Sequence, residues 1–172
     1  MRGDIYCIDT SALIDVRRHY PNGAFGVWPA IERLIADDRL FAPVQVLDEL
    51  LQFDDELRPW LRRHRAMFRS ATPEVVRTIA EMQGEIGPLG DVDRLPEPAD
   101  PWVVAWSVVE NDRLGRGLFP SRCVVVAHEG RRKPGGRRKI PDACDHLGVP
   151  YMRVLDVFAA EGWRFDLVTE PA

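Results

Sequence analysis

The chain has 172 residues and a mass of 19.6 kDa, the size of one ordinary domain. With 45% apolar and 29% charged residues, its composition is that of a globular protein and excludes a disordered or fibrous chain. No apolar run approaches the roughly 18 residues of a membrane span, and the first residues lead into a strand-like stretch instead of a signal peptide. We therefore expect a single cytoplasmic domain over residues 1–172, with its core at about 4–165 and no contact with a membrane.

The charge is unevenly distributed along the chain. Six cations and no anion fall within nine residues, and they are Arg131, Arg132, Lys133, Arg137, Arg138 and Lys139. Because the formal net charge of the chain is −4 and this basic loop carries +6, the rest of the chain carries −10. An acidic body with one basic loop suits a polyanion that must approach a site rich in carboxylates. The alternative is a solvated loop without a partner.

The three cysteines, Cys7, Cys123 and Cys144, form no CxxC pair. Such residues are typical of small buried side chains in a reducing compartment. The spacing predicts no structural zinc site, because Cys144 and His146 are too close along the chain for both side chains to reach one ion.

Apolar spacing and turn residues predict alternating strands and helices. In chain order the first half reads as a strand at 4–8, an apolar stretch at 12–14, a helix from Pro29, a strand at 40–42, a helix from Val44, an Arg-rich helix at 56–69 and a helix at 73–83. The second half reads as a surface loop at 84–99, a buried helix from Asp100, a strand at 123–127, the basic loop, a helix from Pro141 to Gly148, a strand at 149–154 and a helix at 155–161. This order predicts an α/β domain, with a mostly parallel central sheet of four to five strands and helices on both faces.

Several carboxylates fall where a parallel sheet would gather them. They are Asp9 directly after the first strand, Glu49 at the edge of an apolar helix face, Asp100 at a helix N-cap, Glu129 two residues after a strand and Asp142 in the first turn of a helix. Ligands of open α/β sheets bind outside the carboxyl ends of the strands. Buried acids at one place repel each other, so a cation usually accompanies them, and oxygen-only ligands favour Mg²⁺ or Mn²⁺.

The chemistry that needs such a site is phosphodiester hydrolysis, in which the ion activates a water and stabilises charge on the phosphate. The basic loop would then hold the flanking phosphates. Each acid also has a structural interpretation, since Asp9 and Asp100 are good capping residues and a Glu beside an apolar face usually reaches solvent. A phosphatase with an aspartyl nucleophile is disfavoured, because it needs a second Asp where Ser11 stands.

Four short motifs resemble those of PIN domains, and they occur in the same order. They are residues 8–14 (IDTSALI), 46–50 (VLDEL), 99–105 (ADPWVVA) and 124–129 (VVVAHE). The first resembles the Asp-Thr-Ser that follows the opening PIN strand, and the second a Glu followed by an apolar residue on a helix. The third resembles an Asp that opens a buried helix, and the fourth the strand that ends in Thr-x-Asp.

The basic loop with residues 139–144 and 147–150 is similar to one PIN-like branch, long catalogued only as a domain of unknown function. The resemblance covers residues 4–165. It implies a PIN fold, a ribonuclease that depends on Mg²⁺ or Mn²⁺, and the role of a VapC-like toxin in a type II toxin–antitoxin pair. By this resemblance Asp9, Glu49 and Asp100 are catalytic metal ligands, and the protein is a homodimer.

The chain departs from the PIN pattern in the fourth motif, where Ala127-His128-Glu129 stands in place of Thr-x-Asp. Glu129 and Asp142 are therefore alternatives for the fourth catalytic acid. Asp142 is slightly favoured, because Pro141 gives it a defined position at a helix start. His128 is expected to be structural, with a role as general acid or RNA contact as the alternative.

Two expectations concern groups around the acids. Ser11 is expected to support Asp9 through a hydrogen bond, as groups behind a metal ligand commonly do. If the protein is a toxin, an antitoxin segment is expected to cover the acidic pocket with an Arg between the carboxylates. The arginines of the 56–69 helix suit RNA or an acidic antitoxin equally. The altered fourth motif leaves open a different function, that of a catalytically weak or inactive PIN-like module that binds RNA or protein.

Overall fold

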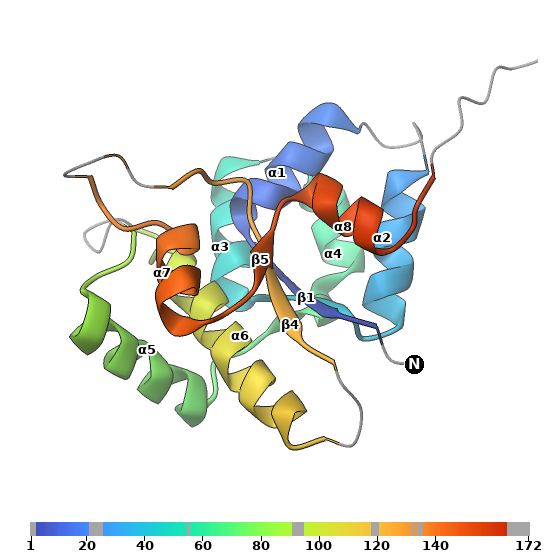
Figure 1. The fold of residues 1–172 in the computed structure, drawn as a ribbon. Helices are drawn as coiled ribbons and strands as arrows, with labels where there is room; N and C mark the ends of the chain where they lie inside the picture. Colours follow the sequence, from blue (N-terminus) through green and yellow to red (C-terminus); the bar gives the residue numbers. More distant parts are fainter. Residues whose placement is uncertain are drawn as a thin grey trace, which may run out of the picture.

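Five short parallel strands form one sheet at the centre of the molecule (Figure 1). In spatial order they are β3 (Phe68–Arg69), β2 (Leu40–Pro43), β1 (Ile5–Ile8), β4 (Cys123–Val126) and β5 (Tyr151–Met152). Every pairing is parallel, as between β1 and β4, where Ile5 lies opposite Cys123 and Ile8 opposite Val126. The predicted α/β class and parallel sheet are therefore confirmed.

This structure is a computed structural model that describes residues 3–20, 26–54, 56–90, 95–117, 121–131, 133 and 136–164. Three predicted features lie outside the described residues: Arg132 of the basic loop, positions 91–94 of the predicted surface loop, and residue 165 at the end of the predicted core.

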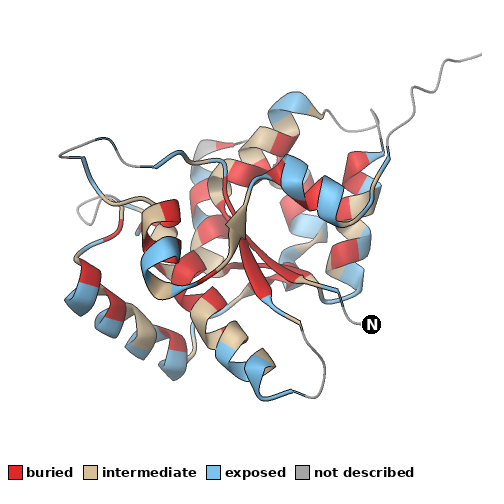
Figure 2. Ribbon diagram, viewed as in Figure 1, coloured by how far each residue is buried: buried red, intermediate tan, exposed pale blue. Residues whose placement is uncertain are grey.

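Helices cover both faces of the sheet. They are α1 (Thr10–His19), α2 (Val27–Ala36), α3 (Val44–Phe53), α4 (Arg58–Arg63), the short 3₁₀-helix η1 (Arg65–Met67), α5 (Pro73–Ile86), α6 (Asp100–Gly115), α7 (Ile140–Leu147) and α8 (Val154–Ala160). Helices α5, α6 and α7 lie on one face, and α1, α2 and α8 on the other (Figure 1). Every residue of β1, β2 and β4 is consequently buried (Figure 2), as expected of parallel strands covered on both sides.

The predicted Arg-rich helix at 56–69 is wrong in its second half. Helix α4 ends at Arg63, the 3₁₀-helix follows, and Phe68–Arg69 is the edge strand β3 paired with β2. The Arg69 guanidinium lies 3.7 Å over the Phe41 ring and 3.5 Å from the buried carboxylate of Glu110. These contacts between distant segments determine the structure here, because a short apolar run is compatible with both a helix and a strand.

Other boundaries differ by smaller amounts. The apolar stretch at 12–14 is part of helix α1, α5 continues to Ile86 into the predicted surface loop, and β5 has only two residues. The predicted helix from Pro141 is confirmed within one residue, and it ends at Gly148, whose φ of 67° is left-handed. The three cysteines are free and buried, as expected.

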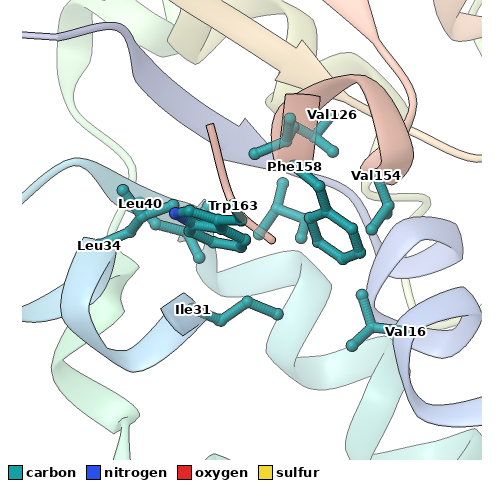
Figure 3. Close-up of a pocket in the computed structure, with 10 residues that line it drawn as sticks. Val16, Ile31, Leu34, Leu40, Val126, Val154, Phe158 and Trp163 are labelled. Atoms are coloured by element: carbon teal, nitrogen blue, oxygen red, sulfur yellow. The ribbon is translucent and has the colours of Figure 1, made fainter. Parts of the chain in front are cut away.

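A small apolar cavity lies between the sheet and helices α1, α2 and α8 (Figure 3). Its volume is about 20 Å³, and its wall includes Ile8, Val126, Phe158 and Trp163. Because only apolar residues line it, a water there would have no hydrogen-bond partner, and the cavity suits no polar substrate. Among the described helices, none has the length and apolar character that crossing a bilayer requires.

An ionic cluster closes the edge of the sheet where the strands begin. The Arg39 guanidinium donates two hydrogen bonds to the Glu161 carboxylate, at 2.9 Å and 2.5 Å, and the buried Tyr6 hydroxyl donates a third at 2.6 Å. These bonds lower the pKa of Glu161 despite its partial burial. The cluster therefore fastens the end of α8 to β1 and to the chain entering β2.

We predict that Glu161→Gln lowers the free energy of unfolding by about 1–3 kcal/mol, because it leaves a partly buried guanidinium without its anion. The measurement is the urea midpoint at unchanged slope. Arg122→Gln is the matched control: it removes the more exposed pair of Arg122 with Asp4 and should change stability by less than about 1 kcal/mol. Equal losses in the two variants would contradict the role of the cluster.

Candidate functional site

Asp9 leaves strand β1 and caps helix α1. Its backbone N–H donates to the Val126 carbonyl of β4 at 2.8 Å, which fixes it at the carboxyl edge of the sheet. Oδ2 accepts two hydrogen bonds from Ser11, from the N–H at 3.0 Å and from the hydroxyl at 2.6 Å, so the expected bond from Ser11 is present. Oδ1 is buried and lacks a hydrogen-bond partner within the described part of the chain. One oxygen of this carboxylate is thus held, and the other is left for a ligand.

Glu49 does not reach solvent, because its side chain turns from α3 toward the same edge and is only 6% exposed. Oε1 accepts a hydrogen bond from the backbone N–H of Ala99 at 3.2 Å, and Oε2 accepts one from the Thr10 hydroxyl at 2.5 Å. Glu49 therefore joins the start of α1 to the start of α6.

Asp100 is the first residue of α6 and not its cap. The N-cap is Ala99, which makes no side-chain capping bond, so the predicted capping role of Asp100 is wrong. The turn before the helix lies against the Asp100 carboxylate instead: a Cβ on Gly90 would stand 3.3 Å from Asp100 Oδ2. Leu89, which is fully buried, anchors this turn. The Asp100 carboxylate is thus partly buried against this turn, and the effect of burial on its pKa exceeds that of the backbone hydrogen bond it accepts.

Glu129 and Asp142 hold different positions around α7. Asp142 stands in the first turn, as predicted, and its Oδ2 accepts a hydrogen bond from the backbone N–H of Lys139 at 3.1 Å. Glu129 Oε2 accepts one from the N–H of Ile140 at 3.4 Å. Repulsion by the Glu129 charge is among the causes that raise the pKa values of both Asp9 and Asp100. The charge of Glu129 thus acts on Asp9 and Asp100, and the choice between Glu129 and Asp142 as the fourth catalytic acid stays a prediction.

Burial and mutual repulsion perturb two of these acids. Burial raises the pKa of Asp100 to about 8, with further increases from the charges of Asp9, Glu129 and Glu49. The pKa of Asp9 rises to about 6, chiefly through burial, although the hydrogen bonds from Ser11 oppose the shift. Perturbed carboxyl groups of this kind mark functional sites more often than structural ones.

The site meets part of the requirements for Mg²⁺ or Mn²⁺. Within the described ranges, no three His, Cys, Asp or Glu side chains lie close enough together to hold one ion as they stand. Mg²⁺ usually binds through one or two carboxylates, with waters and substrate phosphates completing its shell, so a full protein cage is not required. The unpartnered Oδ1 of Asp9 and the uncompensated Asp100 fit that need, and the donor set is oxygen alone. Asp9 and Asp100 would be the principal ligands, with Glu49 and Glu129 beside them.

The basic loop begins directly beside this site. Lys139 Nζ lies 3.8 Å from Glu129 Oε1, and Arg131 pairs with Asp145 of α7. Lys133 and Arg137 are exposed, and Arg138 is partly so. Two cations of the loop, Lys139 and Arg131, therefore lie next to acids on the side of α7.

One family matches the chain, and its description is "Domain of unknown function (DUF4411)", over residues 6–165. The chain belongs to this family. No curated protein and no solved structure matches the chain. The family description names no activity. A function for this DUF4411 chain must therefore be inferred from the side chains at the carboxyl edge of the sheet.

Two contributors to the DUF4411 site escaped the sequence analysis. The Thr10 hydroxyl was part of the quoted Asp-Thr-Ser motif, but nothing local indicated that Glu49, 39 residues away, would be its acceptor. Gly90 carried no signal, because it is one of several glycines and prolines in the segment before α6. Both act through packing between segments that are distant in sequence.

We predict that Gly90→Ala moves the Asp100 carboxylate toward solvent, because the new methyl group would press on Oδ2 at 3.3 Å and on Pro98 at 3.1 Å. Less burial should bring the pKa of Asp100 down from about 8, which ¹³C NMR titration of its carboxyl measures. Gly87→Ala is the control, since it has nearly the same left-handed φ (79° against 77°) but no atom within 4 Å. An unchanged Asp100 titration in Gly90→Ala would contradict this packing.

The raised pKa values predict a pH-dependent stability of the metal-free protein. Between the ordinary Asp pKa of about 4 and the folded values of about 6 and 8, the folded state binds more protons than the unfolded state. Stability should therefore fall as pH rises from about 5 to 8 in EDTA. Asp100→Asn removes the larger shift, so its urea midpoint should fall less over this range. Parallel pH curves for the wild type and Asp100→Asn would refute the shift.

Proposed function

We propose that this protein is a metal-dependent endoribonuclease that hydrolyses RNA phosphodiester bonds. The observation that carries the proposal is the group of carboxylates at the carboxyl edge of the parallel sheet, in which Asp9 keeps an unpartnered buried oxygen and Asp100 stays uncompensated. A pure binding surface has no need of such repelling charges. The adjoining basic loop supplies the complementary charge for a polyanionic substrate.

In this proposal the residues of the site have different roles. Asp9 and Asp100 would hold the ion, and Glu49 and Glu129 would add negative charge around it. When bound, Mg²⁺ or Mn²⁺ supplies an activated water and stabilises the charge that develops on the phosphate. The hydroxyls of Ser11 and Thr10 keep Asp9 and Glu49, respectively, in place through hydrogen bonds. Arg131, Lys133, Arg137, Arg138 and Lys139 bind phosphates on either side of the cleaved bond, together with Arg132.

The PIN resemblance extends this proposal to a cellular role. The four motifs support membership of the PIN superfamily and the function of a VapC-like toxin in the cytoplasm, acting as a homodimer. An antitoxin would then inhibit it by placing an Arg among the carboxylates, where a guanidinium pairs with two oxygens at once. The uncompensated Asp100 is the natural target of such an Arg.

A second candidate function is a binding module without catalysis. It is favoured by the backbone N–H groups that already satisfy one oxygen each of Asp9, Glu49 and Glu129, and by the missing Thr of the fourth motif. Because these hydrogen bonds already stabilise the carboxylate charges, the site depends less on a bound metal ion. The two functions differ in whether metal changes the fate of bound RNA.

The nuclease proposal predicts cleavage of a mixed RNA pool by the pure protein with Mn²⁺ or Mg²⁺ and none in EDTA. Asp9→Asn and Asp100→Asn should each lower the rate by more than about 100-fold, because each removes a ligand. Glu129→Gln should lower it more than Asp142→Asn. Gel analysis of end-labelled RNA measures the rates.

Asp112→Asn is the matched control, an exposed acid on the same helix as Asp100, and it should keep full activity. RNA that stays intact, together with calorimetry that detects no metal binding, would remove the catalytic proposal and leave the binding module. A larger loss in Asp142→Asn than in Glu129→Gln would instead restore Asp142 as the fourth acid.

A further inference from the structure

His128 stands between the carboxylates and the basic loop. Its backbone N–H donates to the Ser11 hydroxyl oxygen at 2.9 Å, and the same hydroxyl donates to Asp9 Oδ2 at 2.6 Å. The chain leaving β4 accordingly runs beside the start of α1 before it enters the basic segment (Figure 1). The backbone of His128 is therefore fixed one hydrogen bond away from Asp9.

The side chains on either side of His128 face different surroundings. Ala127 is buried, Glu129 bonds to the N-terminus of α7, and the His128 ring turns to α1, where Nδ1 lies 3.2 Å from Asp15 Oδ2. The His128 side chain is 49% exposed, whereas that of Asp15 is only 13% exposed. The ring is thus held on one edge by a mostly buried carboxylate and open to solvent on the other.

The position of Asp15 favours one arrangement of the proton on the ring nitrogens of His128. A carboxylate oxygen beside Nδ1 favours the proton on that nitrogen. In the neutral imidazole Nε2 is then a hydrogen-bond acceptor. Phosphate oxygens have no proton to donate to it. In the backbone of a nucleic acid only the ribose 2′-hydroxyl can donate, and that group is absent from DNA.

We propose that His128, oriented by Asp15, accepts a hydrogen bond from a ribose 2′-hydroxyl of the bound strand and so selects RNA over DNA. This inference deepens the proposed nuclease function and rests on it. His128 would be a specificity residue that touches the substrate, and Asp15 a positioning residue that acts through the ring. The basic loop attracts RNA and DNA alike, since phosphate contacts carry no information about the sugar.

The test is binding of a fluorescein-labelled single-stranded RNA and of the DNA of the same sequence, measured by fluorescence anisotropy in EDTA. The wild type should bind RNA about tenfold more tightly than DNA, the effect of one additional hydrogen bond. His128→Ala should weaken RNA binding to the DNA level and leave DNA binding unchanged. His128→Gln, which keeps an acceptor at similar reach, and Asp15→Asn, which keeps a polar partner for the ring, should retain part of the preference.

His19→Ala is the matched control, because His19 lies 2.9 Å from the other oxygen of Asp15 but at the far end of α1. It should keep the full preference for RNA. An RNA-to-DNA affinity ratio that is the same in His128→Ala and the wild type overturns the inference, as does a wild type with no preference. Because these assays exclude metal, that failure is separate from a failure of the nuclease proposal, which would show as intact RNA in Mn²⁺.

Discussion

Negative charge is concentrated where three helices begin, at one edge of the sheet. Asp9 caps α1, Glu49 accepts from the N-cap residue of α6, and Glu129 accepts from the first residue of α7. Helix N-termini present unpaired N–H groups and a partial positive charge, so they stabilise anions nearby. Each helix start thus orients one carboxylate oxygen, and the parallel sheet is what aligns these starts. The stabilisation is incomplete, because one oxygen of Asp9 has no hydrogen-bond partner among the described residues, and burial and the neighbouring acids raise the pKa of Asp100.

Carboxylates lie at both edges of the sheet, but their pKa values shift in opposite directions. Where the strands begin, Arg39 and Tyr6 saturate Glu161, and the pKa of this acid is lowered. Where they end, the acids face one another with hydroxyls and backbone N–H groups as partners, and the pKa values of Asp9 and Asp100 are raised. The first arrangement stabilises the fold. In the second, repulsion between carboxylates remains, and a bound cation or guanidinium would relieve it.

Structural and functional roles overlap at this edge. Thr10 and Ser11 belong to the first turn of α1, yet their hydroxyls bind Glu49 and Asp9 respectively. Through His128 the same turn also reaches the start of the basic loop. The residues after β1 therefore both begin α1 and place polar groups at the sheet edge. This explains why Asp9 viewed singly has a structural role as a cap.

The sequence by itself determined the α/β class, the strands at 4–8, 40–42 and 123–127, the buried helix from Asp100 and the acids that gather at the sheet edge. These follow from local signals: apolar runs, capping residues and proline or glycine at element ends. Only the tertiary structure decided that β3 replaces half of a predicted helix, that the Glu129 charge contributes to the raised pKa values of Asp9 and Asp100, and that Glu49 bonds to Thr10 and Ala99. The reason is the same in each case. Strand pairing and carboxylate contacts join residues dozens of positions apart, and local spacing carries no information about which distant partner is met.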